Sequence, residues 1–250
     1  MNAESIIQAM ALPKDSRVSH RVPKKMLLEQ GAPTAADKRY INDGIEEIIW
    51  IAALKPTNIG VAVYRDESRE YLEIAVLSAT FRPEAKVSRL IELIHRAIPY
   101  PVGLIVTYKK DLSLSLAHKR LAQNEAGKTV VDGNIVTIDI SPDTDLEKTF
   151  TAGLAIAAQP AQNMFALYQR WIERIEALAA ARITGHFVQD VNSEAASTRK
   201  EVLSERAQLK RELISLRAQA STEKQISRRV DLNLAIQKIE NRLKERVAQL

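Results

Sequence analysis

The stretch that decides the fold is residues 102–117, which read VGLIVTYKKDLSLSLA. An apolar run at 102–108 is followed by the turn Lys109–Asp111 and by a run in which leucine alternates with small residues. Apolar residues at every second position are typical of a β-strand with one buried face, because successive side chains point to opposite faces of a sheet. The stretch therefore predicts an antiparallel β-hairpin whose second strand lies at 112–117.

Further strands are predicted on both sides of this hairpin. Upstream, residues 59–64 are apolar and β-branched, residues 66–69 form a polar turn, and residues 71–81 are typical of a buried strand. Downstream, residues 130–140 predict a second hairpin, because Asp132-Gly133-Asn134 interrupts them with turn-forming residues.

Helical periodicity surrounds these strands. Thr34 is a candidate N-cap, and apolar residues spaced three and four apart predict a helix from there to Leu54, ended by Pro56. A second helix is expected between Pro83 and Pro99. A third, over 161–183, ends at a glycine that can adopt a left-handed cap.

The chain is therefore expected to have a mixed α/β (α+β) domain at 1–145 and a helical segment at 146–190 that packs on it. A polar linker at 188–198 leads to a basic, all-α arm at 194–250. Two rows of apolar residues at heptad-like spacing run along the arm, at 209–220 and 232–250. An intramolecular coiled-coil hairpin would bury both rows, and so would a parallel dimer of one long helix.

Charge distinguishes the arm from the rest of the chain. Residues 194–250 carry 13 Lys/Arg and 8 Asp/Glu, and this excess equals the net charge of +5 of the whole chain. Such a basic arm fits a nucleic acid or an acidic partner surface, although a solvated helix face would look the same. The candidate binding residues of the arm are Arg217, Lys224, Arg228 and Arg229.

A second basic cluster follows the strand at 112–117. His118, Lys119 and Arg120 are three donors that we expect to leave the sheet edge together. Such donors bind phosphate or the carboxylates of a partner. The alternative interpretation is an exposed basic strand end.

Several classes of chemistry find no support in the sequence. The absence of cysteine excludes thiolate-ligated metals and thiol catalysis, and the four histidines lack the spacing of a zinc site. No glycine-rich phosphate loop is present. We therefore predict no catalytic residue, no metal and no cofactor.

The longest apolar run has 7 residues, which is short of a membrane span, and without a secretory signal we expect a cytoplasmic protein.

One catalytic alternative concerns the acidic residues Glu46, Glu47, Asp66 and Glu73, whose order faintly resembles that of metal-dependent nucleases. Two carboxylates could hold Mg²⁺, and a lysine two residues after the strand acid would position the attacking water. That position is Ala75. A nuclease with a degraded motif is thus the alternative to a non-enzymatic protein.

A set of short motifs, taken in order, resembles a bacterial family known as domain of unknown function 4391. The motifs are Leu12–Lys14, Ile45–Trp50, Arg69–Ile74, Ala97–Pro101, Leu114–Arg120, Ile183–Gly185 and Glu223–Asn233. The resemblance implies a gene beside helicases and DNA methyltransferases in restriction or phage-defence clusters. It implies no activity and no catalytic residue.

Our leading hypothesis is a non-enzymatic accessory subunit of a DNA-acting complex. Its partners would be helicase or DNA methyltransferase subunits, with DNA bound by the basic arm, a homo-oligomer formed through the C-terminal helices, and no membrane involved. The further alternative is a purely structural oligomeriser whose arm dimerises.

Overall fold

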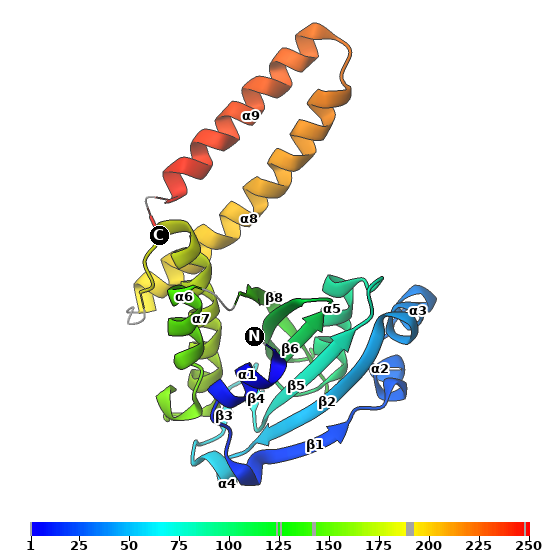
Figure 1. Ribbon diagram of the computed structural model, residues 1–250, viewed down its shortest axis with the longest axis vertical. Coiled ribbons are helices and arrows are strands. Elements are labelled where there is room, and N and C mark those ends of the chain that lie inside the picture. The colour runs from blue at the N-terminus through cyan, green and yellow to red at the C-terminus, as the bar shows by residue number, and fades with distance from the viewer. Residues whose placement is uncertain (1, 124, 126, 142–143, 189–192, 248) are drawn as a thin grey trace. The chain divides into compact units, whose positions relative to one another are not determined.

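The computed structural model describes residues 2–123, 125, 127–141, 144–188, 193–247 and 249–250 (Figure 1). The chain forms two compact units, residues 1–175 and residues 176–250. The division falls within helix α7 (Met164–Thr184). We call the first the sheet unit and describe each unit by itself.

The sheet unit is built on a six-stranded sheet with the order β1-β2-β5-β6-β7-β8. The β5–β6 pair is parallel and the other neighbours are antiparallel. A separate two-stranded sheet pairs β3 (Tyr64–Arg65) with β4 (Glu70–Tyr71). The six strands are β1 (Arg17–Arg21), β2 (Ile45–Leu54), β5 (Ile74–Phe81), β6 (Val102–Tyr108), β7 (Asp111–Leu121) and β8 (Thr129–Ile140).

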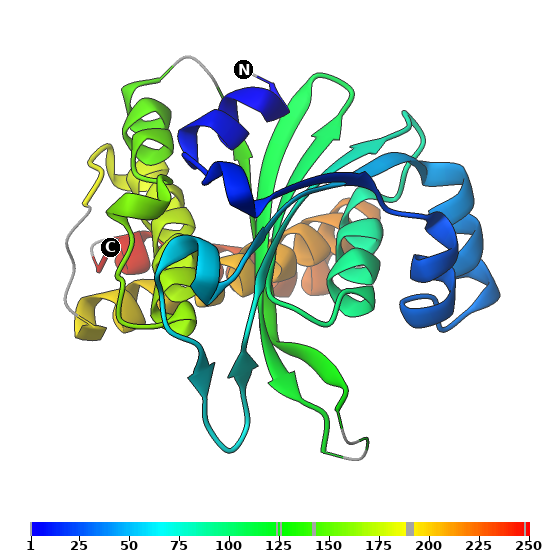
Figure 2. The ribbon, with the colours of Figure 1, turned by 90° about the horizontal axis from the view of Figure 1, so that it is seen from below.

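Helices cover both faces of this sheet, with α5 on one face and α1 on the other (Figure 2). Helices α2 and α3 pack against α5, and its buried residues Leu90, Leu93 and Ile94 belong to the main core. The remaining elements are α1 (Ala3–Ala9), η1 (Lys14–Ser16), α2 (Lys24–Gln30), α3 (Ala35–Gly44), α4 (Pro56–Ile59), α5 (Val87–Ala97), α6 (Asp145–Ala152) and η2 (Ile156–Ala158).

The hairpin predicted at 102–117 is confirmed as β6 and β7, but its second strand is buried on both faces. Ser113, Ser115 and Ala117 are 7%, 0% and 0% exposed, as deeply buried as the leucines between them. The prediction of one buried face was wrong because α5 covers the face that carries the small residues. Small side chains there let the helix approach the sheet closely.

The predicted helix from Thr34 to Leu54 ends ten residues early. Thr34 caps α3 by accepting from the backbone N–H of Asp37, but α3 ends at Gly44 and residues 45–54 form β2. A Cβ at Gly44 would lie 2.8 Å from Leu90 Cδ1, so the chain there passes close to α5. The β-branched and aromatic residues that follow favour a strand, and β1 and β5 pair with it on both sides.

Three other strand predictions also need correction. Residues 130–140 form the single strand β8, because Gly133, at φ 74°, lies where the β7–β8 register shifts and makes a bulge instead of a turn. Of residues 59–64, Ile59 ends α4, Gly60 adopts a left-handed conformation, and only Tyr64 is in a strand. The strand predicted at 71–81 is divided into β4 and β5.

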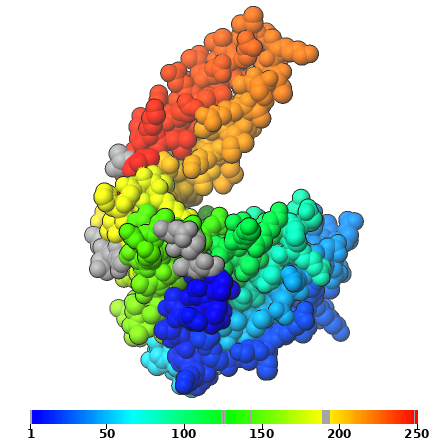
Figure 3. Space-filling model, viewed as in Figure 1, coloured from blue at the N-terminus to red at the C-terminus, as the bar shows by residue number. Residues whose placement is uncertain are grey.

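In the second unit, α8 (Ser193–Thr222) and α9 (Ile226–Val247) form a helical hairpin. The two helices lie side by side (Figure 3). Leu209, Leu213 and Ile239 are its buried centre, with Leu216, Ile236 and Leu243 packed against them. The two apolar rows therefore pack on each other within one chain, as the hairpin alternative predicted.

The ends of the helices test two smaller predictions. Gly185 ends α7 as expected, with φ 83° and its N–H donating to Ala181 O at 2.7 Å. The linker predicted at 188–198 is wrong for residues 193–198, which begin α8, while residues 189–192 lie outside the described residues. Within the described part of the chain, no helix has the length and apolar character needed to cross a membrane.

Candidate functional site

Lys119, the centre of the predicted strand-end cluster, points into the sheet unit. The alternation of β7 directs it toward α5, where its side chain is buried at 1% exposure. Its ammonium donates to the carbonyl oxygen of Ile98 at 2.8 Å and to that of His95. These carbonyls end α5, where the helix carries partial negative charge. Burial lowers the pKa of Lys119 to about 8.

His95 belongs to a polar chain beside Lys119. Thr137 Oγ1 donates to Ser115 Oγ at 2.9 Å, and Ser115 Oγ lies within hydrogen-bond distance of His95 Nε2, at 3.0 Å. His95 is 0% exposed, and its Nδ1 has no hydrogen-bond partner among the described residues. Burial, followed by the charge of Lys119, lowers the pKa of His95 to about 3. A neutral, enclosed imidazole of this kind fixes α5 to the sheet.

His118 points to the opposite face of β7 and binds two side chains. Its Nε2 lies 2.7 Å from Gln169 Oε1, and its Nδ1 lies 2.5 Å from the hydroxyl oxygen of Tyr71. Because an amide oxygen only accepts, Nε2 carries the proton and the Tyr71 hydroxyl donates to Nδ1. The ring also stacks on Phe165, with centroids 5.1 Å apart. Burial raises the pKa of Tyr71.

Arg120 is partly exposed, with 38% of its side chain accessible to solvent. Its Nε lies 3.9 Å from a carboxylate oxygen of Asp132. Asp132 also accepts two bonds from Arg69, at 3.0 and 2.7 Å. The carboxylate is thus shared between two guanidinium groups, of which Arg69 has the better geometry.

The three predicted donors therefore do not leave the sheet edge together. Lys119 faces α5, His118 faces α7, and Arg120 lies near Asp132. Adjacent strand residues point to opposite faces, and both faces of β7 are covered. The expectation of one shared basic surface was wrong, while ligand binding by the individual residues remains a prediction.

Three arginines along the hairpin are paired with carboxylates. Arg217 lies 2.7 Å from Glu240, and the carboxylate of Glu205 lies 2.5 Å from Arg242 and 2.7 Å from Arg246. These bridges join α8 to α9. They neutralise part of the positive charge that the sequence assigns to the arm.

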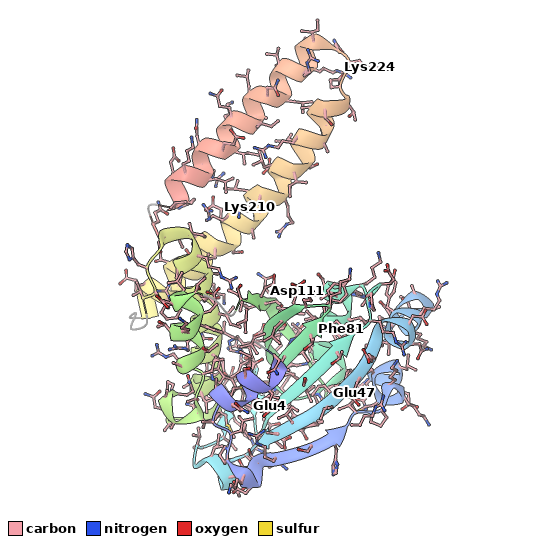
Figure 4. All side chains as sticks on the ribbon, viewed as in Figure 1. Glu4, Glu47, Phe81, Asp111, Lys210 and Lys224 are labelled. Atoms are coloured by element: carbon pink, nitrogen blue, oxygen red, sulfur yellow. The ribbon has the colours of Figure 1, made fainter. Side chains whose placement is uncertain are left out.

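The turn end of the hairpin carries three basic residues close together in the sequence. Lys224, Arg228 and Arg229 are exposed, and none of them forms an ion pair or side-chain hydrogen bond within the described residues. Lys224 lies at this end of the hairpin (Figure 4). The structure thus gathers three of the four predicted arm residues within six positions, while Arg217 is paired with Glu240. We call Lys224, Arg228 and Arg229 the basic end.

The acidic residues of the nuclease alternative are engaged separately. Glu73 pairs with Lys55 at 3.2 Å and Glu47 with Arg21 at 3.7 Å. Asp66 accepts from the backbone N–H groups of Ser68 and Arg69, and the bond from Ser68, followed by that from the Tyr64 hydroxyl, lowers the pKa of Asp66 to about 2. Across the described residues, no three His, Asp or Glu side chains gather as metal ligands.

Sequence reasoning missed two features of these sites. Side chains alternate along β7, and this alternation directs Lys119 to the α5 face. That this direction leads inward is clear only once both faces of the sheet are known to be covered. The second feature is a row of exposed apolar residues on α9, Ile226, Val230 and Leu234. Their spacing of four is a helical signal that the neighbouring heptad-like row obscured.

The comparisons with known proteins add one match. The family model described as Domain of unknown function (DUF4391) matches residues 10–243. No curated protein and no solved structure matches the chain. Since the family model spans nearly the whole sequence, the chain belongs to the family Domain of unknown function (DUF4391).

Proposed function

We propose that this protein is a non-enzymatic accessory subunit of a DNA-acting complex of the restriction or phage-defence kind. In this proposal the basic end of the hairpin contacts DNA phosphates. The sheet unit docks on a helicase or DNA methyltransferase subunit.

The observation that carries the proposal is the clustering of exposed cations without ion pairs at the turn end of the hairpin, since the other such cations of the described hairpin (Lys200, Lys210, Arg211, Lys238 and Lys244) are spread along its two helices. Arg217, Arg242 and Arg246 are bound to carboxylates, whereas the basic end is exposed and has no carboxylate partner among the described residues. Unpaired cations bind phosphates and release the counterions condensed on DNA, which gives affinity without sequence specificity. Contacts at a hairpin end suit a subunit that holds DNA while its partner performs the chemistry.

The non-enzymatic part of the proposal is supported by the roles of the most perturbed titratable groups. Lys119 and His95 are buried and bind a helix end and a serine, respectively. Perturbed groups at catalytic sites face a cleft. These two stabilise the fold instead.

Fluorescence anisotropy with a labelled DNA duplex tests the proposal. The triple variant Lys224→Ala/Arg228→Ala/Arg229→Ala should bind at least about tenfold more weakly at low salt. Its log–log salt dependence should be shallower by about 2 to 3, because up to three phosphate contacts are lost.

The matched control removes the same charge from the sheet unit. Lys38, Arg39 and Lys110 are exposed and form no ion pair within the described residues, so Lys38→Ala/Arg39→Ala/Lys110→Ala should leave the affinity within about twofold. Equal losses in the two triple variants, or a wild-type protein that does not bind duplex DNA at low salt, would overturn the proposal.

A further inference from the structure

The charged residues of the helical hairpin are divided unequally between its two broad faces. Because α8 and α9 lie side by side, the plane through their axes separates one face of the hairpin from the other. Each residue of an α-helix is turned by about 100° from the residue before it. The sides on which the helices pack together are marked by Leu209, Leu213, Ile239 and Leu243. Counting outward from these residues assigns the charged side chains of both helices to a face.

One face carries an excess of positive charge. Over 202–222 and 226–247, all of which the structure describes, its acidic residue is Glu240 alone. Its basic residues are Arg206, Lys210 and Arg217 of α8 and Arg229 and Lys244 of α9. We call these five residues and Glu240 the basic face, and their net charge is +4.

The opposite face is electrically balanced over the same two ranges. Its basic residues are Arg228, Lys238, Arg242 and Arg246, and its acidic residues are Glu205, Glu212, Asp231 and Glu245. The ion pairs support this assignment, because each of them joins residues that helical geometry places on one face. Arg242 and Arg246 pair with Glu205 on the balanced face, and Arg217 pairs with Glu240 on the basic face.

Four cations of the basic face have no carboxylate partner among the described residues. Arg206 donates to the backbone carbonyl oxygen of Leu243 at 2.8 Å, and this neutral group does not cancel its charge. Lys210, Arg229 and Lys244 are exposed and form no ion pair within the described chain. Since Arg206 lies one turn before Lys210 and bonds next to Lys244, the two lysines are within about one turn of each other along the hairpin.

We infer that the basic face binds the phosphates of a DNA duplex that runs along the hairpin, from the basic end toward the hairpin base. Arg229 belongs to both the basic end and the basic face, so one duplex can contact both surfaces without interruption. The inference deepens the proposed function and rests on it, because it gives the path of the DNA beyond the basic end.

The distribution of the cations favours a long polyanion over a single acidic side chain. Arg229 and Lys244 are fifteen residues apart on α9, which is about 22 Å. Duplex DNA rises by about 3.4 Å per base pair and carries negative charge along its whole length, so this span corresponds to about six or seven base pairs. Cations on two adjacent helices over such a length can meet several phosphates at once.

Fluorescence anisotropy of the full chain with a labelled duplex of about 20 base pairs tests the inference. Lys210→Glu/Lys244→Glu should bind at least about tenfold more weakly at low salt, because two phosphate contacts become repulsive. Arg211→Glu/Lys238→Glu is the matched control. It makes the same change of charge on the same two helices, at exposed positions outside the basic face, and should bind within about threefold of the wild type.

The outcomes separate this inference from the proposed function. If the variants of the basic end lose affinity but the two glutamate variants are equally weakened, the basic face is overturned and the basic end stands. A wild-type chain that does not bind the duplex would overturn both. Binding to poly-glutamate instead of DNA, with loss in Lys210→Glu/Lys244→Glu, would assign the face to an acidic protein and overturn the inference. Unchanged far-ultraviolet circular dichroism of each variant verifies that the hairpin is folded.

Discussion

Two groups of basic residues look alike in the sequence and differ in the structure. His118, Lys119 and Arg120 end up facing α7, α5 and Asp132, whereas the basic end of the hairpin faces solvent. The difference comes from the element that carries each group. A strand in a covered sheet sends neighbouring side chains into opposite parts of the core, while the end of a two-helix hairpin has few neighbours that could pair with them. A run of basic residues therefore predicts a binding surface only when the position in the fold of the helix or strand that carries it is known.

The strongest test of this difference between the two groups is to remove one cation from each of them. Lys119→Met keeps the length of the side chain but leaves the carbonyls of His95 and Ile98 without their donor, so it should lower the free energy of unfolding by about 3 kcal/mol. Arg229→Met should change it by less than about 0.5 kcal/mol. Urea denaturation measures both values. Similar losses in the two variants would contradict the distinction.

A second buried cation extends the comparison to another helix end. Arg174 is 9% exposed and donates to Thr149 O at 3.1 Å, near the end of α6. A Cβ at Gly153 would lie 1.6 Å from Arg174 Nη2, so Gly153→Ala must displace the guanidinium. We expect a loss of about 2 kcal/mol in thermal or urea unfolding. A variant as stable as the wild type would show that Arg174 is dispensable for closing α6.

A further prediction is a dependence of stability on pH through His95. Its pKa is about 3 in the folded chain, against 6.5 as the ordinary value, so the unfolded chain takes up the proton first as the pH falls. Its contribution is therefore complete above pH 6.5 and is lost as the pH falls from 6.5 toward 3, by about 1.4 kcal/mol per pH unit.

His95→Gln should flatten this part of the stability profile, and His20→Gln, at an exposed position on β1, should leave it unchanged. Urea midpoints measured between pH 7 and pH 5 give the comparison. An identical slope in wild type and His95→Gln would mean that other groups cause the acid sensitivity.

Local sequence signals were sufficient for elements whose pattern has one interpretation. The β6–β7 hairpin, helix α5 and the two apolar rows of the hairpin follow from periodicity and turn residues. Strand β2 was missed because Ile41, Ile45, Ile48 and Ile49 also fit helical spacing. Residues 45–54 form a strand because they pair with β1 and β5, and both partners are distant in the sequence.

The candidate site was predictable only in part for the same reason. The exposure of Lys224, Arg228 and Arg229 follows from their place at a helical turn. The pairing of Arg217 with Glu240 required the register between α8 and α9, and the burial of Lys119 required knowledge of both layers on the sheet. Sequence reasoning therefore identified the charged residues but not their partners.

The continuous helices of the hairpin give it a defined reach. Twenty-two residues of α9, at about 1.5 Å each, separate the turn from the base of the hairpin by about 33 Å. This span is close to the roughly 34 Å repeat of duplex DNA. Inserting one heptad into both helices would lengthen it by about 10 Å and keep the apolar rows aligned. The distance between the basic end and the base of the hairpin can thus be varied stepwise without altering the sheet.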